Sequence, residues 1–331
     1  MQRCEATPRY SLIEGEPAEE ASFAAEVDRG LTAAQKHIPY RFLYDERGSK
    51  LFEEICETPE YYVTGAEREI LEARSDEISD RYPERVTLAE LGSGNSAKTR
   101  LLIEAFLRRH GGLRYLPVDI SRSMLEESSL ELLEQYRTLE IRAIASEYEA
   151  GLHHVRTETE RPKLIAWLGS NVGNLERAEA ESFVGGIRAA MASVDRLLIG
   201  IDLRKDRQVL EQAYDDPAGA TARFSLNLLG RINRELGGRF DANAFRHRAE
   251  YHEDEGRVEI ALESRCSQTV TIDDIGIEVE FAEGESIHIE NAYKYSLEEV
   301  DGLAATADMG VDGRWLDPLE RFSLNLMAPA G

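Results

Sequence analysis

The chain has 331 residues, of which 42% are hydrophobic, and its formal net charge at pH 7 is −24. This length and composition suit a globular protein of one large or two ordinary domains, and the acidic excess disfavours non-specific binding to nucleic acid or to an anionic membrane. Three scattered cysteines, with no apolar run of about 18 residues and no basic–apolar leader, predict a cytoplasmic protein without a disulfide framework.

The first 80 residues combine helical segments with loops rich in aromatic residues. Residues 1–20 are polar, and we expect them to be irregular. The other expected elements are a helix at Ala21–Leu31, an aromatic loop at Pro39–Lys50, a short helix at Leu51–Cys56 and a second aromatic loop at Pro59–Tyr62. Thr64 and Glu67 have the spacing of a capping box, which predicts a helix running from there to about Ser79.

The stretch Arg85–Arg100 predicts a buried strand, a glycine-rich turn and a helix. Val86, Leu88 and Leu91 are apolar and β-compatible, Gly92–Asn95 interrupts this pattern, and Lys98–Leu107 resumes at helical spacing. Such a turn lets the backbone approach a ligand, and the helix N-terminus offers free N–H groups. The turn lacks the third glycine of a dinucleotide site and the ending of a P-loop. From these residues alone, an ordinary strand–turn–helix unit stays equally open.

Four further strands alternate with helices up to Asp206, which predicts an open, parallel α/β sheet. The strands are expected at Leu113–Ser121, Leu139–Tyr148, Pro162–Asn174 and Arg196–Asp202, with a helix at Ala178–Met191 and a second capping box at Ser123–Glu126. Asp119 and the pair Glu147-Tyr148 stand at strand ends, where ligands of open α/β sheets bind. The pattern suits a nucleoside such as S-adenosylmethionine (SAM) better than NAD.

After Asp206 the pattern changes, which predicts an inserted α+β domain. Helices are expected at Gln208–Tyr214, Ala220–Gly237 and Leu297–Ala307, an antiparallel meander at Arg257–Ser264, Gln268–Ile272, Ile277–Phe281 and Ser286–Asn291, and a strand that rejoins the sheet at Glu320–Met327. The hexapeptide RFSLNL occurs twice, and we assign the copy at Arg223–Leu228 to a helix and the copy at Arg321–Leu326 to a strand.

These elements suggest three parts of the chain. Residues 66–206 and 295–331 would form the SAM-binding domain, and residues 207–294 a substrate domain inserted into it. Residues 1–65 would pack with the substrate domain.

The residues offer little for metal or nucleophilic catalysis. The seven histidines form no metal-ligand motif, so no metal site is expected, and there is no Gly-x-Ser-x-Gly elbow. Group transfer with a reactive cofactor remains. The tyrosines of Tyr40–Tyr44 and Tyr61-Tyr62 could close over such a site, or they could be ordinary packing residues.

Five segments, in order and at matching spacing, resemble the histidine-specific SAM-dependent methyltransferases of the ergothioneine pathway. They are FLYDERGSKLFEEICETPEYYVTGAE, AELGSGNSAKTR, YLPVDIS, WLGSNVGN and IHIENAYKYS. The resemblance runs from about Tyr40 to the C-terminus. It implies a class I, Rossmann-like methyltransferase that trimethylates the α-amino group of L-histidine to give hercynine.

The resemblance also implies roles for individual residues. SAM would be held by Gly92, Gly94, Lys98, Asp119, Glu147 and Tyr148. The amino-acid substrate would be held by Tyr61, Asn174 and Tyr214 at its carboxylate and amine, by Glu290 at its imidazole, and by Phe52 and Ile260 as pocket walls. Asn174 and Tyr44 are the candidate catalytic residues. We expect a monomer that acts on a small molecule and binds neither nucleic acid nor membrane.

One position departs from the family pattern. A Ser commonly stands two residues after the imidazole-binding Glu, and this chain has Ala292 there. The change removes a hydrogen bond worth about 1 kcal/mol, which water or an inward-turned Asn291 could replace. Two alternatives therefore stay open. One is a methyltransferase for tryptophan or another aromatic amino acid, and the other is a SAM- or nucleotide-binding module without catalysis.

Overall fold

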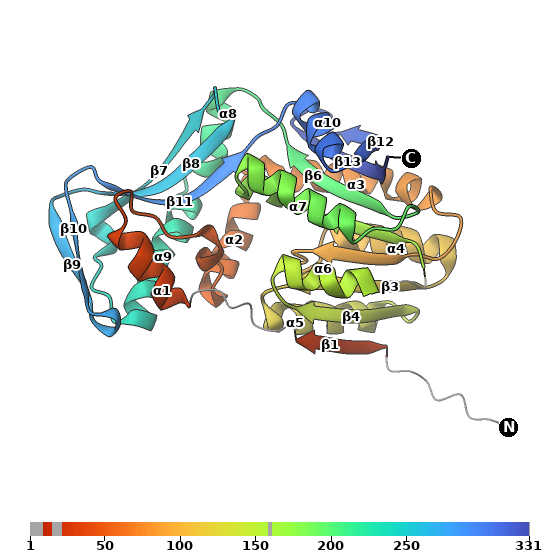
Figure 1. Ribbon diagram of the computed structural model, residues 1–331, viewed down its shortest axis with the longest axis horizontal. Helices are drawn as coiled ribbons and strands as arrows, with labels where there is room; N and C mark the ends of the chain where they lie inside the picture. The colour runs from red at the N-terminus through yellow and green to blue at the C-terminus, as the bar shows by residue number, and fades with distance from the viewer. Residues whose placement is uncertain (1–8, 15–21, 158–160, 331) are drawn as a thin grey trace.

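Buried, mainly apolar strands form the centre of an eight-stranded sheet in the computed structural model, which describes residues 9–14, 22–157 and 161–330 (Figure 1). The sheet order is β1-β4-β3-β2-β5-β6-β13-β12. Its strands are β1 (Tyr10–Glu14), β2 (Thr87–Leu91), β3 (Leu113–Asp119), β4 (Leu139–Ala145), β5 (Lys163–Trp167), β6 (Arg196–Asp202), β12 (Met309–Leu316) and β13 (Phe322–Pro329). Every residue of β2 and β5 is buried, as expected for strands covered on both faces.

Helices cover both faces of this sheet. On one face, a core forms beneath α3 (Tyr62–Asp80), α4 (Thr99–His110) and α5 (Arg122–Gln135). On the other, a second core forms beneath α6 (Tyr148–Thr157), α7 (Arg177–Ala189) and α10 (Leu297–Thr306). The strands from β1 to β6 are parallel to their neighbours, whereas β13 runs antiparallel to both β6 and β12. Apart from β1, this is the strand order of a class I methyltransferase, so the predicted fold is confirmed.

A third hydrophobic core lies beside the sheet and joins two distant stretches of chain (Figure 1). The first stretch gives α1 (Phe23–Thr32), the 3-10 turn η1 (Tyr40–Leu43) and α2 (Glu46–Cys56). The second gives α9 (Ala220–Leu236), β7 (Phe245–His252), β8 (Arg257–Ser264), β9 (Gln268–Ile272), β10 (Ile277–Phe281) and β11 (Ser286–Tyr293). Helix α8 (Arg207–Tyr214) precedes them in the chain, but its buried residues Leu210 and Ala213 belong to the core beneath α3. The domain boundaries given above stay a prediction.

The inserted strands exist where expected, but they do not form one meander. β8 pairs with both β7 and β11, while β9 and β10 form a separate hairpin between β8 and β11 in the chain. The strands β7 and β12 were not expected. In both strands the alternation of apolar and polar residues is weak, because polar residues occupy some inward positions. Their strand structure therefore depends on pairing with a neighbouring strand.

The N-terminal third is more regular than expected. β1 extends the sheet beside β4, although the segment that contains it is polar; residues 1–8 and 15–20 lie outside the described residues. The expected loop Pro39–Lys50 contains η1 and the first turns of α2, which begins at Glu46 after the N-cap Asp45.

Both predicted capping boxes are wrong. α3 begins at Tyr62 with no side-chain cap, and Glu67 turns into the protein interior instead. α5 begins after Ser121, whose hydroxyl accepts a hydrogen bond from the Met124 amide. In each case a tertiary contact or an earlier cap competes with the local motif.

The two RFSLNL copies adopt the expected structures. Arg223–Leu228 lies in α9, and Arg321–Leu326 lies almost entirely in β13. In the described part of the chain, no helix combines the length and the hydrophobicity needed to cross a bilayer.

Candidate active site

The glycine-rich turn after β2 forms an open backbone cradle. Gly92 and Gly94 have φ values of 73° and 50°, which favour glycine. A Cβ on Gly92 would lie 2.6 Å from the Tyr148 hydroxyl, whereas a Cβ on Gly94 would meet nothing within 4 Å. Side chains are therefore excluded at Gly92 by contact, and the space beside Gly94 stays open for a ligand.

Asp119 at the end of β3 faces this turn. Its carboxylate accepts hydrogen bonds from the backbone amides of Gly94 and Ser121, each at 2.9 Å. Burial raises the pKa of Asp119 above its ordinary value, while these amides oppose the shift. The contacts fix the carboxylate at the edge of the cradle, where a ribose would be held.

Tyr148 closes the far side of the cradle. It begins α6 directly after Glu147, and its ring packs against Trp167 and Phe183 with centroid distances of 6.2 and 5.6 Å. Burial raises the pKa of the Tyr148 hydroxyl well above its usual range, so this group stays protonated. Among the described residues, no group of three or more His, Cys, Asp or Glu side chains could hold a metal ion.

Lys98 is held by Glu67, the residue whose spacing from Thr64 predicts a capping box. Glu67 is fully buried and forms an ion pair with the Lys98 ammonium. The Glu67 carboxylate also accepts the Gly169 amide at 2.9 Å. Glu67 thus connects α3 with the start of α4 and with the end of β5. Its burial could have been predicted from the sequence, because the apolar residues Ala66 and Ile70 lie on the same inward side of the helix.

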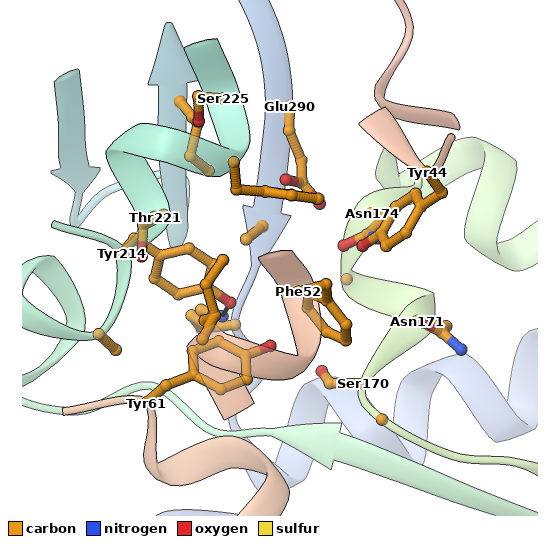
Figure 2. Close-up of a pocket in the computed structure, with 18 residues that line it drawn as sticks. Tyr44, Phe52, Tyr61, Ser170, Asn171, Asn174, Tyr214, Thr221, Ser225 and Glu290 are labelled. Carbon is orange, nitrogen blue, oxygen red and sulfur yellow. Dashed lines mark hydrogen bonds between the residues drawn. The ribbon is translucent and has the colours of Figure 1, made fainter. Parts of the chain in front are cut away.

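A pocket adjoins the cradle at Gly169 and is lined by all seven residues expected to hold the substrate or to act in catalysis (Figure 2). It encloses about 630 Å³ of space, part of it continuous with solvent. The expected residues are Tyr44, Phe52, Tyr61, Asn174, Tyr214, Ile260 and Glu290. Sequence reasoning missed Thr221, Ser225 and Lys294, which also line it.

Aromatic rings form one continuous wall of this pocket. The Phe52 ring contacts Tyr44 and Tyr61 edge-on, with centroids 5.5 and 6.1 Å apart, and Tyr61 contacts Tyr214 at 6.0 Å. Burial raises the pKa of Tyr44, Tyr61 and Tyr214 well above the usual range of tyrosine. These hydroxyls therefore act as neutral hydrogen-bonding groups and not as bases.

Glu290 is the one carboxylate among the described residues that line the pocket, and Figure 2 shows it pointing inward from β11. It lies opposite Ile260 of β8, and the register shifts just before it, between His288 and Glu290. Burial raises the pKa of Glu290 to about 7, and Lys294 opposes the shift. Near neutral pH this group can either accept or share a proton with a ligand.

Ala292 and Asn291 lie on opposite faces of β11, because side chains alternate along a strand. Ala292 lines the pocket. The Asn291 amide oxygen accepts hydrogen bonds from Arg257 at 2.6 Å, and its nitrogen donates to Glu176 at 2.8 Å. Asn291 therefore does not replace the missing hydroxyl at position 292.

A buried ionic cluster lies against the pocket at the end of β6. Asp202 is fully buried and accepts hydrogen bonds from Tyr62 at 2.9 Å and from Lys205, and it pairs with Lys294 at 2.8 Å. Burial alone would raise the pKa of Asp202, but the two ammonium groups hold it below its ordinary value. Burial lowers the pKa of Lys205 to about 8.

Comparisons with known proteins agree with this site. The model of a family described as histidine-specific, SAM-dependent methyltransferases matches residues 23–329. The chain belongs to this family. It is therefore a methyltransferase that uses SAM, and not the alternative, a non-catalytic binding module.

Relatives within this histidine-specific family cover nearly the whole chain. The histidine N-alpha-methyltransferase of Mycobacterium tuberculosis is 38% identical over 315 residues, 95% of this chain and 97% of that protein. The enzyme of the same name from Mycolicibacterium smegmatis is 38% identical over 301 residues, covering 91% and 93%. A more distant relative, the L-tryptophan methyltransferase of Psilocybe serbica, is 25% identical over 311 residues, 87% of each chain.

The Glu67 contacts predict a measurable link between α3 and the cofactor cradle. Glu67→Gln keeps the shape of the side chain but leaves Lys98 without its buried counterion. We expect the free energy of unfolding to fall by about 3 kcal/mol and the affinity for S-adenosylhomocysteine to fall at least fivefold. Denaturant unfolding and calorimetry measure both, and Glu69→Gln, on the exposed face of the same helix, should change stability by less than about 0.5 kcal/mol. Unchanged affinity in Glu67→Gln would show that the pair does not position Lys98.

The raised pKa of Glu290 predicts a pH-dependent stability cost. Between pH 5 and 7 the folded protein keeps a proton on Glu290 that the unfolded chain releases, so this group's contribution to stability falls as pH rises and is constant above pH 7. Glu290→Gln should therefore stabilise the ligand-free protein by roughly 2 kcal/mol more at pH 8 than at pH 5. Denaturant unfolding at both pH values tests this, with Glu283→Gln, which is exposed, as the control. An equal effect at the two pH values contradicts the shifted pKa.

Proposed function

We propose that the enzyme transfers three methyl groups from SAM to the α-amino group of L-histidine, giving hercynine, the betaine from which ergothioneine is made. The observation that carries the proposal is the Glu290 carboxylate, which is the one acidic group among the described residues of a pocket lined mainly by aromatic, aliphatic, hydroxyl and amide groups. An imidazole N–H can donate to this carboxylate, and a phenyl ring cannot. The names of the two mycobacterial relatives agree with this substrate.

The cradle after β2 fits the cofactor, because its glycines leave backbone space and its rim carries a fixed carboxylate. In this proposal Asp119 holds the ribose hydroxyls, and Glu147 with Tyr148 meets the adenine. Lys98 pairs with the methionine carboxylate beside Gly169, and Gly92 and Gly94 supply close backbone. When bound, SAM supplies an electrophilic methyl group.

The pocket residues orient the amino acid. Tyr61, Tyr214 and Asn174 hold its carboxylate and amine through neutral hydrogen bonds, since burial keeps the tyrosines protonated. In Figure 2, Tyr44 and Asn174 lie on one side of the pocket, and Tyr61 and Tyr214 lie on the other. Asn174 and Tyr44 would align the amine with the methyl group, while Phe52 and Ile260 pack against the substrate.

The substrate amine must be deprotonated before each transfer, because a lone pair on nitrogen attacks the methyl carbon. The hydroxyls of Tyr44, Tyr61 and Tyr214 are already protonated near neutral pH and cannot take that proton, so we propose that it leaves to solvent through the open side of the pocket. The reaction ends after three transfers, because a quaternary nitrogen has no lone pair.

We further propose that the protein works as a cytoplasmic monomer. Residues 66–206 and 295–331 would form the SAM-binding domain and residues 207–294 the substrate domain. The separate hydrophobic core that joins residues 27–55 to residues 220–289 supports a second unit beside the sheet.

A tryptophan methyltransferase is the second candidate. Ala292 and the relative from Psilocybe serbica favour it, because a smaller residue leaves room for an indole ring. Glu290 argues against it. An indole would offer this carboxylate only one N–H donor, which would not offset the large cost of burying the ionised group away from water.

Ligand binding separates the two candidates. With S-adenosylhomocysteine present, calorimetry should detect L-histidine binding that weakens at least tenfold in Glu290→Ala, because a charge-assisted hydrogen bond is lost. The affinity for S-adenosylhomocysteine itself should stay within twofold. Tighter binding of L-tryptophan than of L-histidine by the wild-type protein would overturn the proposal.

Ala292→Ser tests the departure from the family pattern. The added hydroxyl can donate to or accept from the second imidazole nitrogen, worth about 1 kcal/mol, so L-histidine should bind about fivefold more tightly. L-Tryptophan should gain nothing. If both ligands respond alike, position 292 does not face the substrate ring.

A further inference from the structure

Lys294 is the one cation among the described residues that line the pocket. It follows Glu290 by four residues and comes directly after β11, and it lines the pocket together with Glu290 and Ala292. Its side chain is 1% exposed. A buried lysine is costly unless it is paired, so its surroundings define its role.

Two oxygen atoms hold the Lys294 ammonium. The Asp202 carboxylate lies 2.8 Å from it, and the Tyr214 hydroxyl oxygen lies 2.7 Å from it. Asp202 is itself fixed by Tyr62 and Lys205. The ammonium is therefore locked between a rigid carboxylate and a residue of the pocket wall.

This contact fixes the direction of the Tyr214 hydroxyl. An ammonium group donates hydrogen bonds only, so the phenol oxygen must accept. The single hydroxyl proton of Tyr214 then points elsewhere, and no described residue accepts it. Because Tyr214 lines the pocket, that proton is available to an acceptor on the ligand.

The cluster also gives the pocket an electrical polarity. One carboxylate, Asp202, balances two ammonium groups, Lys205 and Lys294, which leaves a net positive charge at this end below about pH 8. Glu290 supplies negative charge elsewhere in the same pocket when it is ionised. A ligand with an anionic group and a ring N–H is complementary to both ends, and is disfavoured in the reversed orientation.

We propose that Lys294 is a positioning residue that makes the enzyme selective for amino acids with a free carboxylate over the corresponding amines. It does so by holding Tyr214 as a hydrogen-bond donor and by placing a positive charge behind it. The inference rests on the proposed function, because it takes L-histidine as the ligand. It predicts that the carboxylate, and not the amine, lies against Tyr214.

The test compares L-histidine with histamine, which lacks only the carboxylate, by calorimetry with S-adenosylhomocysteine present. Lys294→Met should weaken L-histidine binding at least tenfold and change histamine binding by less than twofold. The matched control is Lys205→Met, which removes the other cation paired with Asp202 but does not line the pocket. It should change the ratio of the two affinities clearly less than Lys294→Met does, because Lys205 contributes charge but does not hold Tyr214, even where thermal unfolding shows that both variants are destabilised.

Tyr214→Phe provides a readout that leaves the ion pair intact. It should reduce the preference for L-histidine over histamine about as much as Lys294→Met does. In the double variant the preference should fall by less than a further twofold. The proposal is overturned if Tyr214→Phe keeps the preference, or if Lys294→Met and Lys205→Met change the ratio equally. Failure of the proposed function is distinct, because the wild-type protein would then not bind L-histidine at all.

Discussion

The site depends on one buried carboxylate, Asp202, at the end of β6. A fully buried charge is stable only with close partners, and Asp202 has two ammonium groups and the Tyr62 hydroxyl. These partners come from the start of α3, from the loop after β6 and from the end of β11. Through Lys294 the same carboxylate also reaches Tyr214 at the end of α8. A single electrostatic requirement thus holds the edge of the parallel sheet against the segments that shape the substrate pocket.

The same principle operates at the cofactor cradle. Glu67 is buried, and its contacts with Lys98 and the Gly169 amide connect α3 to the carboxyl ends of the central strands. α3 therefore supplies Tyr62 to one cluster and Glu67 to the other, five residues apart. Because Gly169 also lines the pocket, the helix links the geometry of the cradle to that of the pocket. Methyl transfer needs such a shared framework, since the reacting atoms must meet in line.

The local sequence pattern was sufficient to predict the strands of the central sheet. Buried parallel strands are continuous apolar runs, and the glycine turn marks where the first strand ends. It was insufficient where distant contacts compete: Glu67 has the spacing of a cap but neutralises Lys98, and β1 is a short, partly exposed edge strand. The substrate residues were grouped only by resemblance to a family, because three-dimensional proximity of Tyr44, Tyr214 and Glu290 has no local signature. Lys294 could in principle have been predicted to line the pocket, because it follows Glu290 at an even spacing.

The position of β13 has a consequence for biosynthesis. This strand fills the slot between β6 and β12, and its Ser323 bonds to Ile201, 122 residues earlier. During translation, β6 leaves the ribosome long before its antiparallel neighbour exists, so its apolar edge must wait while the whole intervening α+β segment is made. An unpaired strand edge invites association between nascent chains. The RFSLNL copy in α9 emerges during this interval. Because it folds into a helix, it is not available to pair with the free edge of β6, which the second copy occupies in the finished sheet.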